Sequence, residues 1–265
     1  MKNKKIAIIG CGNLGLTIAH GLLDDGFTAS DITATRRNTN SLTALREKGV
    51  LVTSDNAEAV KNADIIVLAV KPYNVEPILA EIQDALVSTR HILACLATGI
   101  TLDELSKWGG SELPIFRAMP NTAADVNESM TLICDKGATI EQRNVITGLF
   151  DKIGTTLYID ENLMEAATIL GACGIAYVLR FMRAMIQGGI EVGFDAKTAT
   201  AIVSQTMKGA SELIIQNQSH PESEIDKVTT PKGCTITGLN EMEHAGFSSA
   251  LIKGIVASYK KIEHH

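Results

Sequence analysis

Short apolar runs separated by turn residues recur through the first half of the chain. In each run both sets of alternating positions are largely apolar, which is typical of strands that are buried on both faces of a sheet. We therefore predict strands at Lys5–Ile9, Ile32–Thr35, Ile65–Val70, His91–Ala97, Ile115–Met119 and Met130–Cys134.

Segments with helical spacing lie between several of these runs. They are Leu14–Leu23, Ser41–Lys48, Val75–Gln83 and Leu102–Lys107. Strands that alternate with helices favour a parallel sheet with right-handed crossovers. The predicted fold class is thus α/β, with residues 1–160 forming a Rossmann-type, doubly wound dinucleotide-binding domain.

The pattern changes after Tyr158–Asp160, where long helical stretches begin. We predict helices at Asn162–Val192, at Ala196–Gln216 and near Ser248–Ile262, so that residues 161–265 form an all-helical domain. Asp195 stands where it can cap the second of these helices, and Gly188, Gly189 and Gly193 mark the end of the first.

The helix predicted at Asn162–Val192 carries apolar residues on most of its faces. One Rossmann domain cannot cover all of them, and exposed apolar patches usually mark interfaces. We expect a homo-oligomer in which this helix is buried between subunits. A core helix inside a monomer is the alternative.

Composition narrows the functional classes. With 45% hydrophobic and 20% charged residues the chain is an ordinary globular protein, and its net charge of −6 gives no general attraction to nucleic acid or anionic lipid. The longest uncharged stretch, Ala166–Leu179, is too short to span a bilayer, so no membrane partner is expected. The five cysteines are widely spaced without CxxC pairs, which suggests neither disulfides nor a metal site and fits a cytoplasmic location.

A glycine-rich turn follows the first predicted strand and opens a helix. Its sequence is Gly10-Cys11-Gly12-Asn13-Leu14-Gly15. The first glycine permits a tight turn, the second lets the backbone approach a pyrophosphate, and the third lets the helix pack on the sheet. The turn is therefore predicted to bind a dinucleotide, although such a turn can also be merely structural.

The end of the second strand indicates which dinucleotide binds. An acidic residue there would hydrogen-bond a ribose 2′-hydroxyl, but this chain has Arg36 and Arg37 instead. Guanidinium groups form charge-assisted bonds with a phosphate. NADP(H) is accordingly favoured over NAD(H), with solvation of Arg37 at the surface as the alternative.

Two further strand ends are predicted to border the cofactor. One is Ala69-Val70-Lys71-Pro72, where Lys71 either contacts the cofactor or is solvated. The other is Ala97, followed by Thr98 and Gly99, whose small size permits close approach of a nicotinamide ribose.

Two polar turns are candidates for the substrate site. The first, Met119-Pro120-Asn121-Thr122, ends a strand, and the second, Thr229–Thr235, precedes a helix predicted to start near Ile236. Thr235 is a plausible N-cap there, and free amides from Gly233 onward would point at a carboxylate. An ordinary capped loop is the alternative.

These motifs resemble those of the pyrroline-5-carboxylate reductase family along nearly the whole chain. The resemblance rests on GCGNLG, AVKP, MPNT and, above all, VTTPKGCTITGLNEMEHAGF. It implies NADPH-dependent reduction of 1-pyrroline-5-carboxylate to proline by a homodimer built through the helical domain, which family members often extend to rings. The implied substrate residues are Thr230, Gly233, Thr235, Met119 and Asn121, with Thr235 near the imine nitrogen as the catalytic hydroxyl and Asn56 on the adenosine side of the cofactor.

The chain departs from the family pattern at two places. Lys232 replaces the first of two glycines after the proline, and Gly171–Tyr177 lacks the serine and the helix-kinking proline of the usual GSGPAY. A β-hydroxyacid dehydrogenase-like oxidoreductase is the first rival, but it needs a lysine where the long helix offers Arg180 and Arg183. A non-catalytic dinucleotide-binding paralogue is the second.

Overall fold

The computed structural model of the chain describes residues 4–263 and divides it into two units. The first unit runs to Cys173 and takes in the chain again from Lys261, and the second is Gly174–Lys260. The sequence pattern placed this change at residue 160 instead. The difference arises because the first turns of the helical segment pack on the sheet, where Met164 is fully buried.

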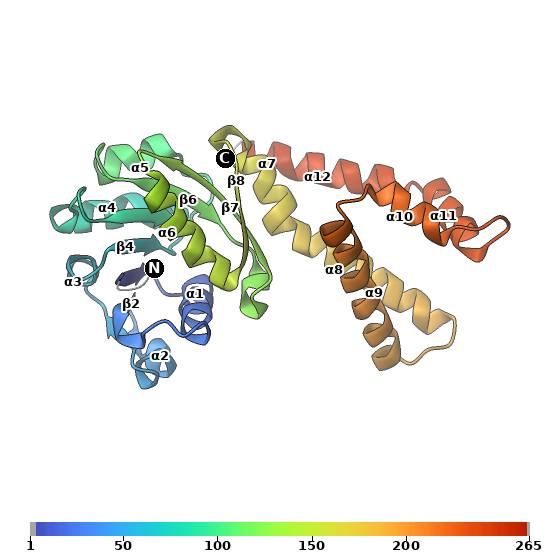
Figure 1. The fold of residues 1–265 in the computed structure, drawn as a ribbon, viewed down its shortest axis with the longest axis horizontal. Helices are drawn as coiled ribbons and strands as arrows, with labels where there is room; N and C mark the ends of the chain where they lie inside the picture. The colour runs from blue at the N-terminus through green and yellow to red at the C-terminus, as the bar shows by residue number, and fades with distance from the viewer. Residues whose placement is uncertain (1–3, 264–265) are drawn as a thin grey trace. The chain divides into compact units, whose positions relative to one another are not determined.

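The described residues of the first unit form an eight-stranded sheet with the order β3-β2-β1-β4-β5-β6-β7-β8 (Figure 1). The strands are β1 (Ile6–Ile9), β2 (Ile32–Thr35), β3 (Leu51–Thr53), β4 (Ile65–Leu68), β5 (Ile92–Cys95), β6 (Ile115–Met119), β7 (Ser129–Lys136) and β8 (Gly154–Tyr158). All neighbours are parallel except β6 and β7. The predicted doubly wound fold is confirmed, and β3 and β8 are additions to it.

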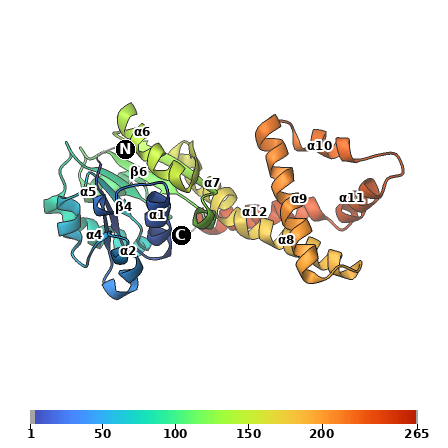
Figure 2. The same cartoon turned by 60° about the horizontal axis from the view of Figure 1, so that its bottom comes forward.

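Helices cover both faces of this sheet because both faces of its strands are apolar (Figure 2). Along β4, Ile65 and Val67 join one core cluster while Ile66 and Leu68 join the other. The helices of this unit are α1 (Asn13–Asp24), α2 (Thr43–Glu47), α3 (Asn56–Lys61), α4 (Val75–Ile82), α5 (Leu102–Gly109), α6 (Ile140–Phe150) and α7 (Met164–Thr168). Helices α1 and α6 contribute to the first cluster, and α4 and α5 to the second.

A buried arginine joins the sheet to the start of the helical segment. Arg117, on β6, has a side chain only 3% exposed, and it pairs with Glu161 at 3.0 Å and Glu165 at 2.8 Å. Burial opposes the charged form, but the two carboxylates outweigh it and raise the pKa of Arg117. Glu161 also accepts a 2.6 Å hydrogen bond from the amide of Leu102, so the same carboxylate fixes the start of α5.

The second unit is helical, as predicted. After a π-helical turn at Ile169–Cys173 come α8 (Gly174–Glu191), α9 (Ala196–Asn217), α10 (Pro221–Val228), α11 (Cys234–His244) and α12 (Phe247–Glu263). The Asp195 carboxylate caps α9 by accepting from the amides of Lys197 and Thr198. Gly188 and Gly189 lie inside α8, so that of the three glycines only Gly193, with φ +115°, stands beyond its end.

Helix α8 leaves its apolar side chains open within this chain, and no residue in it is buried. Val178 and Leu179 are 47% and 57% exposed. By length and hydropathy, Glu161–Glu191 is the one helical stretch among the described residues that meets the criterion for a membrane span, which is weak evidence by itself. An exposed apolar face of this kind usually marks an interface. A second subunit would remove it from water as well as lipid would.

We expect Arg117→Met to lower the free energy of unfolding by about 3 kcal/mol, because it leaves two carboxylates facing an apolar strand. Urea denaturation of the purified protein measures the change. The control is Lys136→Met, whose pair with Asp103 is exposed on both sides (49% and 86%), so its loss is expected to cost less than about 0.5 kcal/mol. Equal losses in the two variants would contradict the structural role of Arg117.

Candidate functional site

The glycine-rich turn brings three backbone segments into close contact. Gly10 has φ +78°, and a Cβ on it would lie 2.1 Å from Cγ1 of Val70, at the end of the neighbouring strand segment. A Cβ on Gly15 would lie 3.1 Å from Cγ2 of Ile8 and 3.3 Å from Sγ of Cys11, so this glycine lets α1 pack on β1. The tight turn at Gly10 and the close helix packing at Gly15 agree with the roles predicted for these glycines from the sequence.

Gly12 serves differently, because no protein side chain crowds it. The nearest atom to a Cβ built there is the carbonyl oxygen of Gly10, at 3.8 Å. Gly12 is also the N-cap of α1 and supplies no side-chain cap. The amides of the first helical turn therefore face open space, which is the arrangement that binds phosphate groups.

A cleft of about 870 Å³ opens above this turn at the carboxyl edge of the sheet. Its lining includes these residues singled out from the sequence: Gly10, Gly12, Asn13, Leu14, Arg36, Arg37, Asn56, Ala69, Val70, Lys71, Pro72 and Ala97. Gly15 lies beneath the turn and does not line the cleft. The ends of four strands, β1, β2, β4 and β5, thus meet around one cavity, as expected where an open α/β sheet binds a ligand.

Two arginines line this cleft, and neither guanidinium has a carboxylate partner among the described residues. Arg36 is half-buried and its Nη1 lies 3.5 Å from the carbonyl oxygen of Cys11, while Arg37 is exposed. Neither forms an ion pair within residues 4–263. A phosphate on the ligand would supply the missing charge.

The cleft also contains residues that the sequence reasoning missed. They are Ile9, Thr35, Asn38, Ser54, Asn74, Ile78, Glu81 and Leu96, whereas Thr98, which the sequence placed at a predicted cofactor edge, lines the cleft as expected. Ser54 follows β3, which was not predicted, and Ile78 and Glu81 lie one turn apart on α4. For Ile78 and Glu81 the only signal in the sequence is their i, i+3 spacing on a helix that follows a strand whose end lines the cleft.

Met119 and Asn121 end β6 but do not line the cleft. The hydroxyl of Thr98 lies 3.8 Å from Sδ of Met119, which links Met119 to the cleft's edge. Asn121 is 7% exposed, and its side chain accepts from the amide of Ala123 and donates to the carbonyl oxygen of Gly171 in the π-helical turn, both at 2.9 Å. Within this chain both ends of the Asn121 amide therefore hold backbone groups.

The turn before α11 is well formed. The amide of Gly233 donates to the carbonyl oxygen of Thr230 at 2.9 Å, with Pro231 and Lys232 between them and φ +61° at Lys232. Gly233, not Thr235, is the N-cap of α11, because the helix begins at Cys234, two residues before the predicted start. The predicted capping role of Thr235 is wrong, since the residue lies in the first helical turn, and no side chain caps this helix.

The cysteine thiols near the cleft are poor nucleophiles. Burial raises the pKa of Cys11 to about 12, against a lowering contribution from Arg36, and burial raises that of Cys95 to about 11. Both therefore remain protonated near neutral pH. Neither histidine nor cysteine is among the described residues that line the cleft.

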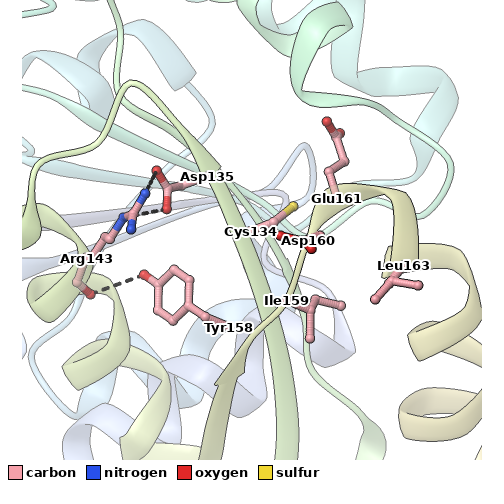
Figure 3. A pocket seen from close by; sticks show the side chains of 8 residues that line it. All are labelled: Cys134, Asp135, Arg143, Tyr158, Ile159, Asp160, Glu161 and Leu163. Carbon is pink, nitrogen blue, oxygen red and sulfur yellow. Dashed lines mark hydrogen bonds and ion pairs between the residues drawn. The ribbon is translucent and has the colours of Figure 1, made fainter.

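A second hollow, of about 510 Å³, lies on the β7–β8 side of the sheet (Figure 3). Its cation, Arg143, is paired with Asp135 at 2.8 Å and accepts a 3.4 Å hydrogen bond from the Tyr158 hydroxyl at its carbonyl oxygen. Burial raises the pKa of Cys134 there to about 11. Among the described residues that line it, the one cation is already paired with Asp135 and no glycine turn is present, so this hollow is the weaker candidate for a functional site.

Two family profiles match the chain. Residues 161–265 match pyrroline-5-carboxylate reductase dimerisation, and residues 5–97 match NADP oxidoreductase, coenzyme F420-dependent. Pyrroline-5-carboxylate reductase 1 of Dictyostelium discoideum is 41% identical over 97% of this chain, which spans 49% of that protein's length. Pyrroline-5-carboxylate reductase 2 of the same organism is 42% identical, over 98% of this chain and 92% of its own length.

Solved structures of pyrroline-5-carboxylate reductases are also similar to this chain. A pyrroline-5-carboxylate reductase from Coxiella burnetii has a TM-score of 0.93 and 28% identity, covering 99% of this chain and 98% of the other. The pyrroline carboxylate reductase of Plasmodium falciparum, solved with NADP bound, has a TM-score of 0.89 and 26% identity, covering 100% and 98%. The similarity therefore extends over both units of the chain.

We expect Gly10→Ala to abolish dinucleotide binding and to lower the free energy of unfolding by more than about 2 kcal/mol, because the new methyl group meets Val70. The matched control is Gly26→Ala. Gly26 has φ +82° but nothing within 4 Å of its Cβ position, so it incurs only backbone strain of about 1 kcal/mol. Coenzyme fluorescence titration and urea denaturation measure both effects, and equal behaviour of the two variants would show that the close contact is unimportant.

Proposed function

The chain belongs to the pyrroline-5-carboxylate reductase family, and we propose that it reduces 1-pyrroline-5-carboxylate to L-proline with NADPH, the last step of proline synthesis. The observation that carries the proposal is the single cleft in which the glycine turn, the strand ends and two unpaired guanidiniums meet. The similarity to pyrroline-5-carboxylate reductases suggests the substrate. The residues that line the cleft support the binding of a phosphorylated coenzyme.

The residues of the cleft fit a phosphorylated dinucleotide. The uncrowded Gly12 and the first turn of α1 would hold the pyrophosphate, and Arg36 with Arg37 would hold the 2′-phosphate. Ala69, Val70, Lys71 and Pro72 would contact the coenzyme mainly through backbone, and Ala97 leaves room for the nicotinamide ribose. NADH would bind less well, because it lacks the group that pairs with the guanidiniums.

The bound coenzyme supplies a hydride to the imine carbon, and the protein's part is to align the substrate and exclude water. We propose that Thr230, Gly233 and Thr235 hold the substrate carboxylate and ring, with the Thr235 hydroxyl near the imine nitrogen. In support, the amides at the start of α11 lack a side-chain cap. Met119 and Asn121 would border the nicotinamide, and Asn121 would act through the backbone it holds.

A protonated imine is already electrophilic, so a strong protein acid is not needed. Our proposal therefore assigns orientation and hydrogen bonding, rather than proton transfer by a histidine or lysine, to the protein. The helix α8 supports this choice over a hydroxyacid dehydrogenase, because it contains Arg180 and Arg183 and no lysine.

We further propose a homodimer formed through the helical unit, with assembly into a larger ring, in the cytoplasm. The dimerisation profile over residues 161–265 and the open apolar face of α8 support the dimer. Burial of Val178 and Leu179 against a second subunit would remove from water a face that the single chain leaves exposed.

The purified protein with NADPH and 1-pyrroline-5-carboxylate is expected to consume NADPH steadily, and Thr235→Ala is expected to lower kcat/KM about tenfold or more while NADPH affinity is retained. Absorbance at the NADPH band follows the reaction. Thr237→Ala is the control, because that hydroxyl is already bonded to the carbonyl oxygen of Gly233 at 3.2 Å. Coenzyme binding without turnover would indicate a non-catalytic paralogue, and activity only on a hydroxyacid would indicate a dehydrogenase.

Arg36→Ala is expected to raise the KM for NADPH about 10- to 100-fold, because a charge-assisted bond to the 2′-phosphate is lost, and to change the KM for NADH little. Steady-state kinetics with both coenzymes give the ratio. An unchanged preference would refute the assignment of the phosphate to this arginine.

A further inference from the structure

A hydrogen-bonded chain crosses one end of the coenzyme cleft and ends in a carboxylate. The amide of Gly10 donates to Oγ1 of Thr35 at 3.3 Å, and Oγ1 of Thr35 donates to Oδ1 of Asn56 at 2.6 Å. Nδ2 of Asn56 then lies 3.2 Å from each carboxylate oxygen of Glu81. The glycine turn, the end of β2, the start of α3 and the face of α4 are thus linked through side chains.

Donor and acceptor roles along this chain fix the orientation of its members. Because the Thr35 hydroxyl accepts from a backbone amide, its single proton is available for Asn56, whose oxygen must therefore face it. The amide nitrogen of Asn56 then donates to the carboxylate of Glu81. Asn56 accordingly holds the Glu81 carboxylate in place at the cleft's edge.

The Glu81 carboxylate has acceptor capacity left for a ligand. Two carboxylate oxygens offer about four acceptor sites, and the Asn56 amide occupies only part of them. No ion pair of Glu81 with Arg36 or Arg37 is formed in the part of the chain that the structure describes. A ligand group placed here must be a hydrogen-bond donor, since phosphate would be repelled.

An apolar side chain precedes Glu81 on the side of α4 that lines the cleft. Ile78 precedes Glu81 by one helical turn on α4, and both line the cleft together with Pro72. An apolar side chain one helical turn from an acceptor matches a nucleobase that carries an amino group. The adenosine part of a nicotinamide dinucleotide offers two kinds of hydrogen-bond donor, the ribose hydroxyls and the amino group of adenine. An apolar neighbour is needed only beside the adenine, because its ring is apolar on both faces.

On this basis, and resting on the proposed use of NADPH, we propose that Glu81 recognises the 6-amino group of adenine and makes the enzyme selective for adenine coenzymes. Asn56 is the positioning residue that holds the carboxylate, and Ile78 supplies the surface for the ring. In this proposal the adenine lies at the opposite end of the coenzyme from the nicotinamide, which transfers the hydride. The selectivity therefore affects the affinity for the coenzyme and not the rate of turnover.

The test uses reduced nicotinamide hypoxanthine dinucleotide phosphate, in which a carbonyl oxygen replaces the 6-amino group. The wild-type protein is expected to show a KM about tenfold higher for this analogue than for NADPH, at similar kcat. In Glu81→Gln the ratio is expected to fall close to one, because an amide can either accept from an amino group or donate to a carbonyl oxygen. Glu76→Gln, an exposed carboxylate on the same helix outside the cleft, is the control and is expected to keep the wild-type ratio.

Two results would overturn the proposal. One is an unchanged hypoxanthine-to-adenine ratio in Glu81→Gln, and the other is a change confined to the NADPH-to-NADH ratio, which would place the carboxylate beside the ribose instead of the base. Equilibrium titration of both coenzymes by fluorescence gives the same ratio without turnover. If the titration shows the expected selectivity while 1-pyrroline-5-carboxylate is not reduced, the assignment of Glu81 stands and the proposed function fails.

Discussion

The contact between Gly10 and Val70 is the constraint on which the rest of the cleft depends. Only a glycine at φ +78° lets the chain leave β1, turn against the end of β4 and enter α1 without a clash. Because the turn is that tight, the first amides of α1 point into the cleft, and the amide of Gly10 reaches the Thr35 hydroxyl at the end of β2. A shift of this turn would displace the proposed pyrophosphate site and loosen the hydrogen-bonded chain to Asn56 at the same time.

The strand order explains why so many separate segments reach one cavity. β1 lies between β2 and β4, so the connections that follow β1 and β4 leave on opposite sides, and a crevice forms where they separate. The two core clusters hold the helices on either face in place, and the parallel register aligns the strand ends. Arg117 ties the start of the helical segment to the sheet, since its two carboxylate partners follow β8, Glu161 just before α7 and Glu165 within it.

Local sequence predicted the features that depend on local chemistry. The strands with both faces apolar were found, and so were the glycine turn and the Asp195 cap, because each requires particular residues at fixed spacing. β3 was missed because it has three residues and Leu51 is 52% exposed, and β8 because its burial alternates. Thr235 was misassigned because a capping residue and a first-turn threonine look alike in sequence. Glu81 was missed because its role depends on Asn56, 25 residues away in the chain.

The two departures from the family pattern differ in their structural effect. At Lys232 the turn needs a left-handed residue, and lysine adopts φ +61° there at a cost of about 1 kcal/mol while the bond between Gly233 and Thr230 is kept. Lys232 thus adds a cation to a turn that keeps its internal hydrogen bond. Just before the place where the usual proline would bend the helix, this chain has a π-helical turn whose Gly171 carbonyl oxygen accepts from Asn121. A π-helical turn and a proline both interrupt the regular hydrogen-bond ladder of a helix, so this chain has such an interruption here without a proline.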